Sequence, residues 1–159
     1  MTPRIENILR RLRRRNGNVM IEFALGSGIM LAAFTGTFQF GYTFLQYNNL
    51  QNAVARGARF ASLAPYDSAN DTPTTAFTDK VKNMVLYGST TAGATPVLPG
   101  LTAANVNVVP FGISGPLKIP TKMTVSITGY TINSIFASNT LTNKPQVSYA
   151  YQGVWSPIP

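Results

Sequence analysis

The fold of this chain is decided by residues 10–45, which read RRLRRRNGNVMIEFALGSGIMLAAFTGTFQFGYTFL. Five arginines come first, then Asn16-Gly17, and then a long apolar run. Residues 23–45 contain no charged side chain and are long enough to cross a bilayer, which needs about 20 apolar residues. The pattern therefore predicts a membrane-spanning segment over about residues 21–45.

The same helix is expected to continue beyond the membrane. No proline occurs between Pro3 and Pro65, so nothing in the sequence forces a break, and we predict one long helix over residues 18–64. Its second half is amphipathic, because polar residues alternate with an apolar stripe at helical spacing. The stripe consists of Leu50, Val54, Ala58 and Ala61. We expect it to lie on a globular head, with Arg56 and Arg59 near the helix end, where the helix dipole favours cations.

The positive charge is concentrated before the apolar run. The formal charge of the chain is +8, and residues 1–17 carry six Arg and one Glu, which gives +5 and leaves +3 for the remainder. A basic cluster directly before an apolar helix is what the positive-inside rule requires, so we interpret it as a cytoplasmic topology signal rather than a nucleic-acid site. The cluster comprises Arg10, Arg11, Arg13, Arg14 and Arg15.

One carboxylate, Glu22, interrupts the apolar run five residues after Gly17. A charge costs roughly 2.5–3.5 kcal/mol at a bilayer centre and less near its edge, so Glu22 calls for a partner and is a functional candidate. The alternative is that Glu22 is simply a favourable acid in the first turn of a helix.

Small side chains recur every four residues inside the spanning segment, where they form a narrow strip along one helix face. They are Ala24, Gly28, Ala32 and Gly36. Such strips favour close helix association in lipid, and this strip is a candidate packing surface. The alternative is that Gly and Ala are simply common in membrane helices.

After Pro65 the sequence becomes polar and rich in turn-forming residues, as in an extracytoplasmic head over residues 65–159. Thr72-Pro73 predicts a helix start, with Thr72 as N-cap, and Gly88 predicts the end of a helix over about residues 73–87. Residues 105–109, 122–132 and 146–155 have the β-branched and alternating pattern of strands. We therefore predict an α+β protein: a long N-terminal helix, then a small head with one further helix and a short antiparallel sheet.

The chain offers little for catalysis. It has no Cys and no His, which excludes a thiolate or imidazole metal site and a Cys or Ser-His catalytic pair. The acids after Gly17 are Glu22, Asp67, Asp71 and Asp79, and they include neither a calcium loop nor paired carboxylates. Nucleotide-binding and nucleophile motifs are also missing. We expect no enzyme activity, no cofactor and no metal.

The segment Gly17-Asn18-Val19-Met20-Ile21-Glu22 resembles type IV pilins and pseudopilins, whose precursors carry a basic leader that ends in Gly and a helix with Glu at its fifth position. Residues 22–25, EFAL, and 52–61, NAVARGARFA, are similar more narrowly to the TadE-like family of minor pilins or pseudopilins of tight-adherence systems. The resemblance covers about residues 10–64. It fits a minor subunit as well as the main building block of a filament.

The resemblance implies that residues 1–17 are a leader that a prepilin peptidase removes between Gly17 and Asn18. It also implies that the chain waits in the bacterial inner membrane, with the leader cytoplasmic, and then enters a periplasmic or extracellular filament. The implied partners are the peptidase, other pilins or copies of itself, and an inner-membrane assembly platform.

Charge pairing supports this reading independently of the resemblance. Cleavage after Gly17 creates an ammonium group at Asn18, one helical turn before Glu22, where the two charges can neutralise each other within one chain or between neighbours. Burying such a pair would fix the axial register of subunits more than it would stabilise them. Two other functions remain open: a signal-anchored periplasmic binding or adhesion protein that does not polymerise, and a secreted protein cut near residues 53–55, AVA.

Overall fold

The computed structural model describes residues 3–68, 72–113, 119–134 and 138–153, and for residues 3–16 it describes the backbone only. The chain forms two compact units, Met1–Gly41 and Tyr42–Pro159, which we call unit 1 and unit 2. Each unit is described by itself below.

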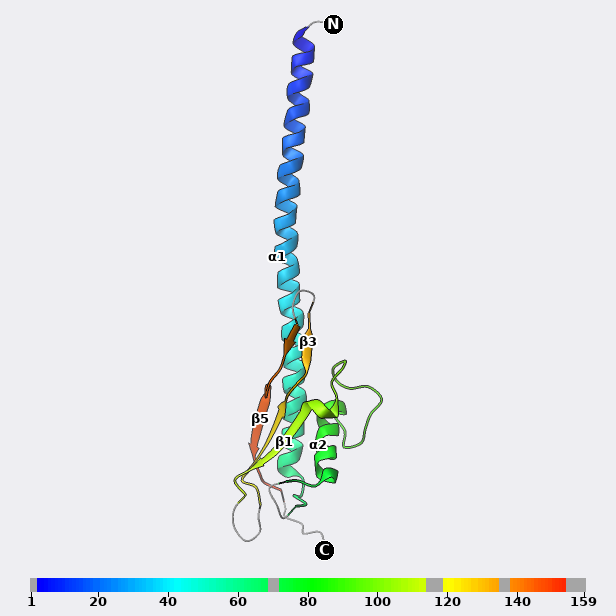
Figure 1. Cartoon of the computed structure of the whole chain (residues 1–159), viewed down its shortest axis with the longest axis vertical. Coiled ribbons are helices and arrows are strands. Elements are labelled where there is room, and N and C mark those ends of the chain that lie inside the picture. The colour runs from blue at the N-terminus through cyan, green and yellow to red at the C-terminus, as the bar shows by residue number, and fades with distance from the viewer. Residues whose placement is uncertain (1–2, 69–71, 114–118, 135–137, 154–159) are drawn as a thin grey trace. The chain divides into compact units, whose positions relative to one another are not determined.

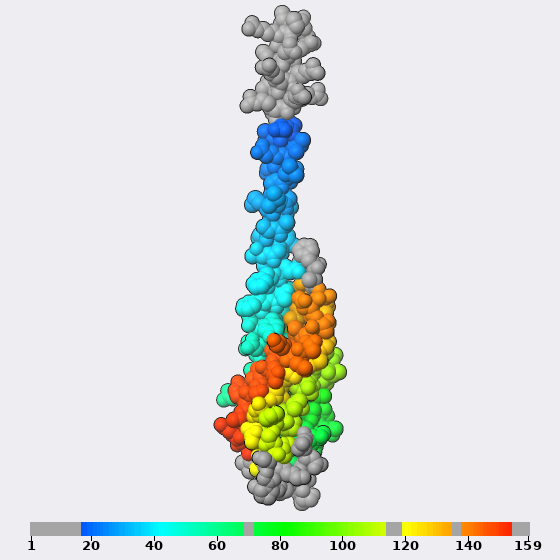
Figure 2. All heavy atoms as spheres, turned by 60° about the vertical axis from the view of Figure 1, so that its left-hand side comes forward, coloured from blue at the N-terminus to red at the C-terminus, as the bar shows by residue number. Residues whose placement is uncertain are grey.

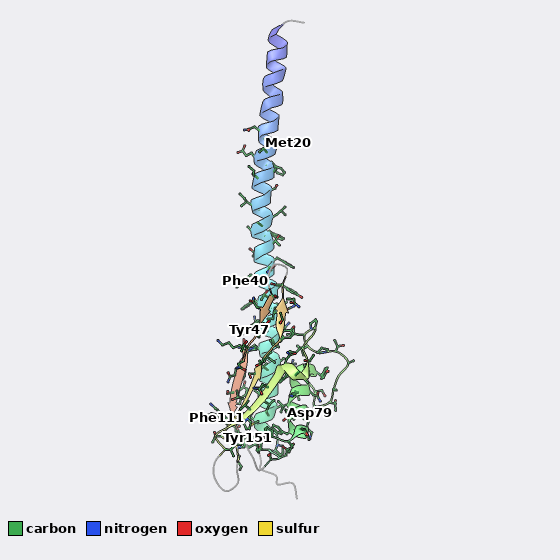
Figure 3. The ribbon with its side chains drawn as sticks, in the orientation of Figure 1. Met20, Phe40, Tyr47, Asp79, Phe111 and Tyr151 are labelled. Carbon is green, nitrogen blue, oxygen red and sulfur yellow. The ribbon has the colours of Figure 1, made fainter. Side chains whose placement is uncertain are left out.

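Helix α1, Pro3–Leu63, is the first element (Figure 1). It is unbroken up to Leu63, as the absence of proline predicted, but it begins at Pro3 rather than at residue 18. In unit 1 its side chains from Gly17 onward are almost all exposed, and Met20 projects away from the ribbon in Figure 3. The hydroxyl groups of Ser27, Thr35 and Thr37 donate to α1 carbonyl groups three or four residues earlier. Their polar groups are thereby satisfied within the helix, which suits an apolar surrounding.

Unit 2 combines the end of α1 with a second helix and two small sheets, so the predicted α+β class is confirmed (Figure 1). Its further elements are α2 (Thr75–Tyr87), η1 (Ala103–Asn105), β1 (Val106–Phe111), β2 (Lys122–Ile127), β3 (Thr131–Asn133), β4 (Ser138–Thr140) and β5 (Gln146–Ala150). The three-stranded sheet has the order β1-β2-β5, and both of its pairings are antiparallel. Strands β3 and β4 form a separate antiparallel pair.

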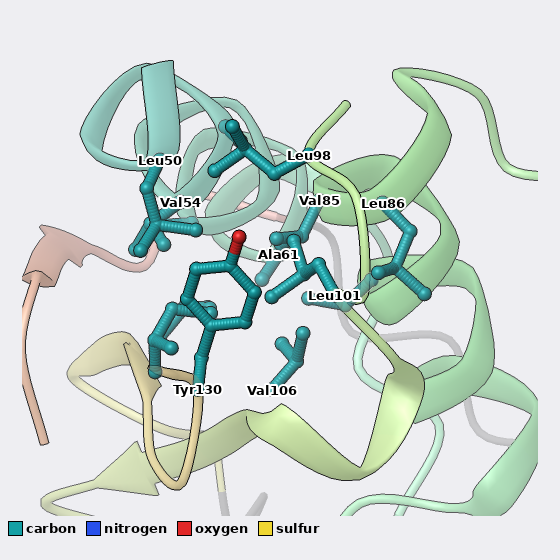
Figure 4. Packing of buried hydrophobic residues seen from close by; sticks show 14 of the residues in the cluster. Leu50, Val54, Ala61, Val85, Leu86, Leu98, Leu101, Val106 and Tyr130 are labelled. Atoms are coloured by element: carbon teal, nitrogen blue, oxygen red, sulfur yellow. The ribbon is translucent and has the colours of Figure 1, made fainter. Parts of the chain in front are cut away.

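The core of unit 2 lies between the sheet and the two helices. The apolar stripe of α1 packs there as predicted, because Leu50, Val54, Ala58 and Ala61 are completely buried. Figure 4 shows Leu50, Val54 and Ala61 of this stripe in one cluster with Tyr130, Val85 and the loop residues Leu98 and Leu101. A hydrophobic cluster of this kind is the main source of stability for so small a head.

Strand β2 supplies the central layer of this core. Met123, Val125 and Ile127 are completely buried, so the apolar side of the alternating pattern in residues 122–127 faces the core. The opposite side is also covered, because Thr124 and Ser126 are buried between the neighbouring strands. The hydroxyl groups of Thr124 and Ser148 form a cross-strand hydrogen bond of 2.8 Å, which satisfies polar groups on that side.

The predicted strand over residues 122–132 is two strands in the structure. β2 ends at Ile127, Gly129 adopts a φ of 73°, and β3 begins at Thr131. A left-handed residue cannot continue an extended strand, and glycine adopts this conformation without steric cost. The turn buries Tyr130, whose hydroxyl group donates to the carbonyl group of Pro99 at 3.1 Å.

Two other predicted boundaries need correction. The strand predicted over residues 146–155 ends at Ala150, and Trp155 lies outside the described residues. Thr72 is not the N-cap of the second helix, because α2 begins at Thr75 and is capped by Thr74, whose hydroxyl group accepts from the N–H of Phe77 at 3.3 Å. The predicted end is confirmed, since Gly88 has a φ of 71° and its N–H donates to the carbonyl group of Met84.

Candidate functional site

The first candidate site is the segment from Gly17 to Glu22 in unit 1. These residues are helical, and Gly17, Asn18 and Glu22 are exposed. A Cβ added at Gly17 would meet no atom within 4 Å. The described fold therefore gives no structural reason for glycine at position 17, and its role in processing stays a prediction.

The second feature is the apolar surface that surrounds Glu22. Phe23 is 76% exposed and Met30 75% exposed, and other large apolar side chains of unit 1 are similarly open to solvent. The α1 segment Gly17–Leu63 is long and apolar enough to cross a membrane. So large an exposed apolar surface requires lipid or protein to cover it.

The strip of small residues lies within this surface. Ala24, Gly28, Ala32 and Gly36 are all exposed, and a Cβ added at Gly28 or Gly36 would meet no atom within 4 Å. The fold of the described chain therefore does not require small residues here. Their use as a packing surface for other helices stays a prediction.

The arginines of the chain fall into two groups. The side chains of Arg10, Arg11, Arg13, Arg14 and Arg15 lie outside what the structure describes, so the topology signal stays a prediction. In unit 2, the interpretation that Arg56 and Arg59 meet the end of their own helix needs correction, because the last turn of α1 contains no basic residue. A Cβ placed on Gly88 would lie 3.3 Å from a guanidinium nitrogen of Arg56, so this cation sits at the C-terminus of α2 instead.

Unit 2 also contains a surface groove that sequence reasoning missed. One part of it, a hollow of about 480 Å³, lies beside α1 and is bordered by Arg56, Arg59 and Tyr149. The register places Tyr149 opposite the buried Met123, but at the edge of the sheet its side chain is 41% exposed. No local pattern could have revealed this groove, because it joins segments about ninety residues apart.

The described residues hold no cluster of three or more potential metal ligands. Asp67, one of the four acids after Gly17, accepts hydrogen bonds from the backbone N–H and the hydroxyl group of Thr74. It therefore supports the start of α2. Asn70 and Asp71 lie outside the described residues.

An exposed apolar helix long enough to cross a membrane, followed by a small α+β head, indicates the class of membrane-anchored proteins. Residues 17–59 match the family model described as TadE-like protein, which confirms the predicted TadE-like resemblance of this segment. No curated protein and no solved structure matched the chain.

The match has consequences for function at the level of the class. It links residues 17–59 to a family of pilin-like proteins of Tad pili, which are structural rather than enzymatic and associate with other pilins and with the membrane. The matched residues include the Gly17-to-Glu22 segment and Leu50, Val54 and Ala58 of the buried α1 stripe, and they end before Ala61 and α2. The match therefore leaves the remaining residues of the head without an assigned role.

Proposed function

We propose that this chain is a structural subunit of a Tad-like pilus or pseudopilus. In this proposal it is inserted in the bacterial inner membrane, cut by a prepilin peptidase after Gly17, and assembled through its N-terminal helix. The observation that carries the proposal is the exposed Glu22, which is the only charged residue between positions 17 and 55.

The charge of Glu22 requires a partner, and membrane insertion alone does not explain why a charge is present in the apolar helix. Cleavage after Gly17 would convert the backbone nitrogen of Asn18 into an ammonium group one turn away from the carboxylate. In a growing filament the ammonium group of an entering subunit could pair with Glu22 of a neighbour. Leaving one member of such a buried pair alone costs about 3–5 kcal/mol, so pairing would select one axial register.

The strip of Ala24, Gly28, Ala32 and Gly36 supports the same proposal. In lipid, helices associate through close packing and hydrogen bonds rather than through the hydrophobic effect. Because the strip is exposed and the glycine positions are open, a neighbouring helix could approach it closely. An inner-membrane assembly platform would bring subunits together before they leave the bilayer.

Replacement of Gly17 tests the maturation step. We expect Gly17→Trp to block cleavage and to leave a membrane protein that is longer by the 17-residue leader, because the open position gives the folded chain no reason to reject a bulky side chain. Intact-mass measurement of the membrane fraction and of sheared surface filaments distinguishes the two forms. Gly26→Trp, at another open glycine, is the matched control and should be processed normally.

The same masses decide between the possible functions. Chains that start at Asn18 in sheared filaments support the proposal. Chains that start at Met1 in functional assemblies would contradict maturation and favour a signal-anchored binding or adhesion protein, whereas a start near Arg56 would favour a secreted protein. Normal processing of Gly17→Trp would also contradict the proposal.

A further inference from the structure

The groove on unit 2 is made of two adjoining hollows along α1 and β5. The first has a volume of about 480 Å³ and includes Asn49, Asn52 and Val97 in its walls, and the second, of about 380 Å³, includes Ser62, Ala150 and Gln152. Arg59 and Tyr149 border both hollows and so join them. Figure 2 shows β5 on the surface beside the part of α1 that belongs to unit 2.

Strand β5 presents a free edge to this groove. The N–H of Tyr151 donates to Thr121, and the carbonyl group of Pro145 accepts from Ile127, so the odd positions of this strand face β2. Successive residues of a strand direct their backbone groups to opposite sides, and Ser148 and Ala150 therefore point theirs away from β2. Both residues are exposed, and no other described strand pairs with this edge.

One contact shows that this edge can hydrogen-bond outward. The N–H of Gln152 donates to the carbonyl group of Ser62 in α1 at 2.9 Å. This bond fixes the end of the strand against α1 and leaves the outward groups of Ser148 and Ala150 available. Unpaired edge groups next to a groove are the geometry that accepts an added strand.

The charge of the groove specifies what kind of strand fits. Arg56 and Arg59 are its charged lining residues, and no acidic residue lines either hollow. In the part of the chain that the structure describes, neither arginine forms an ion pair with a carboxylate. An incoming segment with acidic side chains on one face would therefore complement the groove.

We propose that the free edge of β5, together with Arg56 and Arg59, binds an extended acidic segment of another protein by strand addition. The backbone of the segment pairs with Ser148 and Ala150, and its acidic side chains reach the arginines. The proposal does not depend on cleavage after Gly17 or on filament formation, so it can fail or succeed independently of the proposed function.

A second copy of this chain would fit the groove less well than an acidic partner protein. It has 13 Lys and Arg against 5 Asp and Glu, and none of its described strands contains an acid. An anionic membrane surface would satisfy the arginines but would leave the strand edge unpaired. The edge and the arginines together therefore favour an acidic polypeptide.

Binding of short peptides to the purified full-length chain in zwitterionic detergent tests the proposal directly. The probe is a fluorescent eight-residue peptide in which Glu alternates with Val, and its fluorescence anisotropy reports binding. One matched peptide carries Lys in place of Glu, and another carries N-methyl groups on the residues that would face β5. We expect the Glu peptide to bind, and both control peptides to bind at least tenfold more weakly.

Variants of the protein locate the binding site. Arg56→Gln and Arg59→Gln should each weaken binding of the Glu peptide about two- to fivefold, as expected for exposed ion pairs, and added salt should reduce the difference. Lys80→Gln, which removes the same charge from an exposed position on α2, should leave binding unchanged. Ala150→Pro removes an outward N–H on an edge strand, where proline is tolerated, and should weaken binding more than Ala150→Val does.

Three results would contradict the proposal. Equal binding of the methylated and unmethylated Glu peptides would overturn strand addition, because a purely electrostatic surface does not need free backbone groups. Binding that persists unchanged in the Arg56→Gln, Arg59→Gln double variant would overturn the site. Binding to vesicles that contain anionic lipid, without binding of the Glu peptide, would assign the arginines to the membrane surface and contradict the proposal.

Discussion

Gly57 allows α1 and α2 to approach closely in unit 2. A Cβ added at this position would lie 2.2 Å from Cγ2 of Val85, which is closer than real Cβ contacts occur, and Val85 is completely buried. A valine side chain is stiff and cannot move away without disturbing the core. The glycine of the NAVARGARFA segment is therefore explained by packing within the head.

We expect Gly57→Ala to lower the free energy of unfolding by about 1–3 kcal/mol, because overpacking outweighs the better helix propensity of alanine. Thermal unfolding of the full chain in detergent, followed by circular dichroism, measures the loss. Gly36→Ala, where the added Cβ meets open space, is the control and should not be destabilised. A Gly57→Ala, Val85→Ala double variant that is no better than the sum of the two single variants would contradict this account.

Tyr151 connects the end of the sheet to the end of α1. Its hydroxyl group accepts from the N–H of Tyr66 at 2.7 Å and donates to the carbonyl group of Ala64 at 2.9 Å. Burial raises the pKa of Tyr151 above its ordinary value, the hydrogen bond from Tyr66 opposes this effect, and the charge of Asp67 adds to it. Burial, and secondarily Tyr42, raises the pKa of Tyr130 as well.

These directions predict alkaline unfolding. Both phenols ionise near pH 10 in the unfolded chain and at higher pH in the folded chain, because folding raises their pKa. Their contribution to the stability of the fold is therefore complete below about pH 10 and is lost as the pH rises further. Unfolding midpoints measured between pH 7 and 11 should fall at the alkaline end. The unfolding midpoint of Tyr151→Phe should fall less steeply in this range. At pH 7 the free energy of unfolding of this variant should be about 1–3 kcal/mol lower, because the N–H of Tyr66 loses its acceptor. An unchanged alkaline slope in Tyr151→Phe would show that its phenol does not contribute.

At the scale of elements, α2 depends on its cap. The hydroxyl group of Thr74 accepts from Phe77 and donates to the carboxylate of Asp67, while Thr72 lies two residues earlier and is exposed. We expect Thr74→Ala to cost about 1 kcal/mol of stability and Thr72→Ala to cost almost nothing. Thermal midpoints of the two variants, measured side by side, check this expectation. A larger loss of stability in Thr72→Ala than in Thr74→Ala would mean that Thr72 is the N-cap, as the sequence predicted.

The sequence predicted elements well where local chemistry decides them. The long α1, the end of α2 at Gly88 and the buried face of β2 all follow from proline placement, a left-handed glycine or apolar periodicity. The prediction that Thr72 caps α2 was wrong, because two further threonines follow Pro73 and only the folded chain brings Asp67 to one of them, Thr74. Strand β4 could not be predicted, since Ser138–Thr140 is polar and exposed, and its pairing with β3 is a tertiary contact.

At the scale of the molecule, the two candidate sites differ in whether the sequence alone can reveal them: the Glu22 region can be found from the sequence, and the groove beside β5 cannot. Glu22 stands out because a charge within an apolar run is unusual in any structure. The groove beside β5 cannot be predicted from the sequence, because Arg56, Arg59 and Tyr149 belong to no common motif and come together only when the sheet packs on α1. The TadE-like match covers the arginines but not Tyr149, so it does not reveal the groove either.

The assembly role of Glu22 can be separated from its effect on insertion. Removing the carboxylate makes the helix more apolar, so Glu22→Ala should reach the membrane at normal levels. In cells that also produce the unaltered chain, we expect the variant to be at least about tenfold depleted from sheared filaments, because the ammonium group of a neighbouring Asn18 would be buried without a partner.

Quantitative mass spectrometry of membranes and filaments from the same cells measures both ratios. Glu22→Asp keeps the charge on a shorter side chain and should be incorporated better than Glu22→Ala, whereas a variant that merely disturbed the helix would show the opposite order, since aspartate is the poorer helix former. Equal incorporation of Glu22→Ala and the unaltered chain would mean that no buried ammonium group depends on this carboxylate. The acid would then act only as a favourable charge at the start of the mature helix.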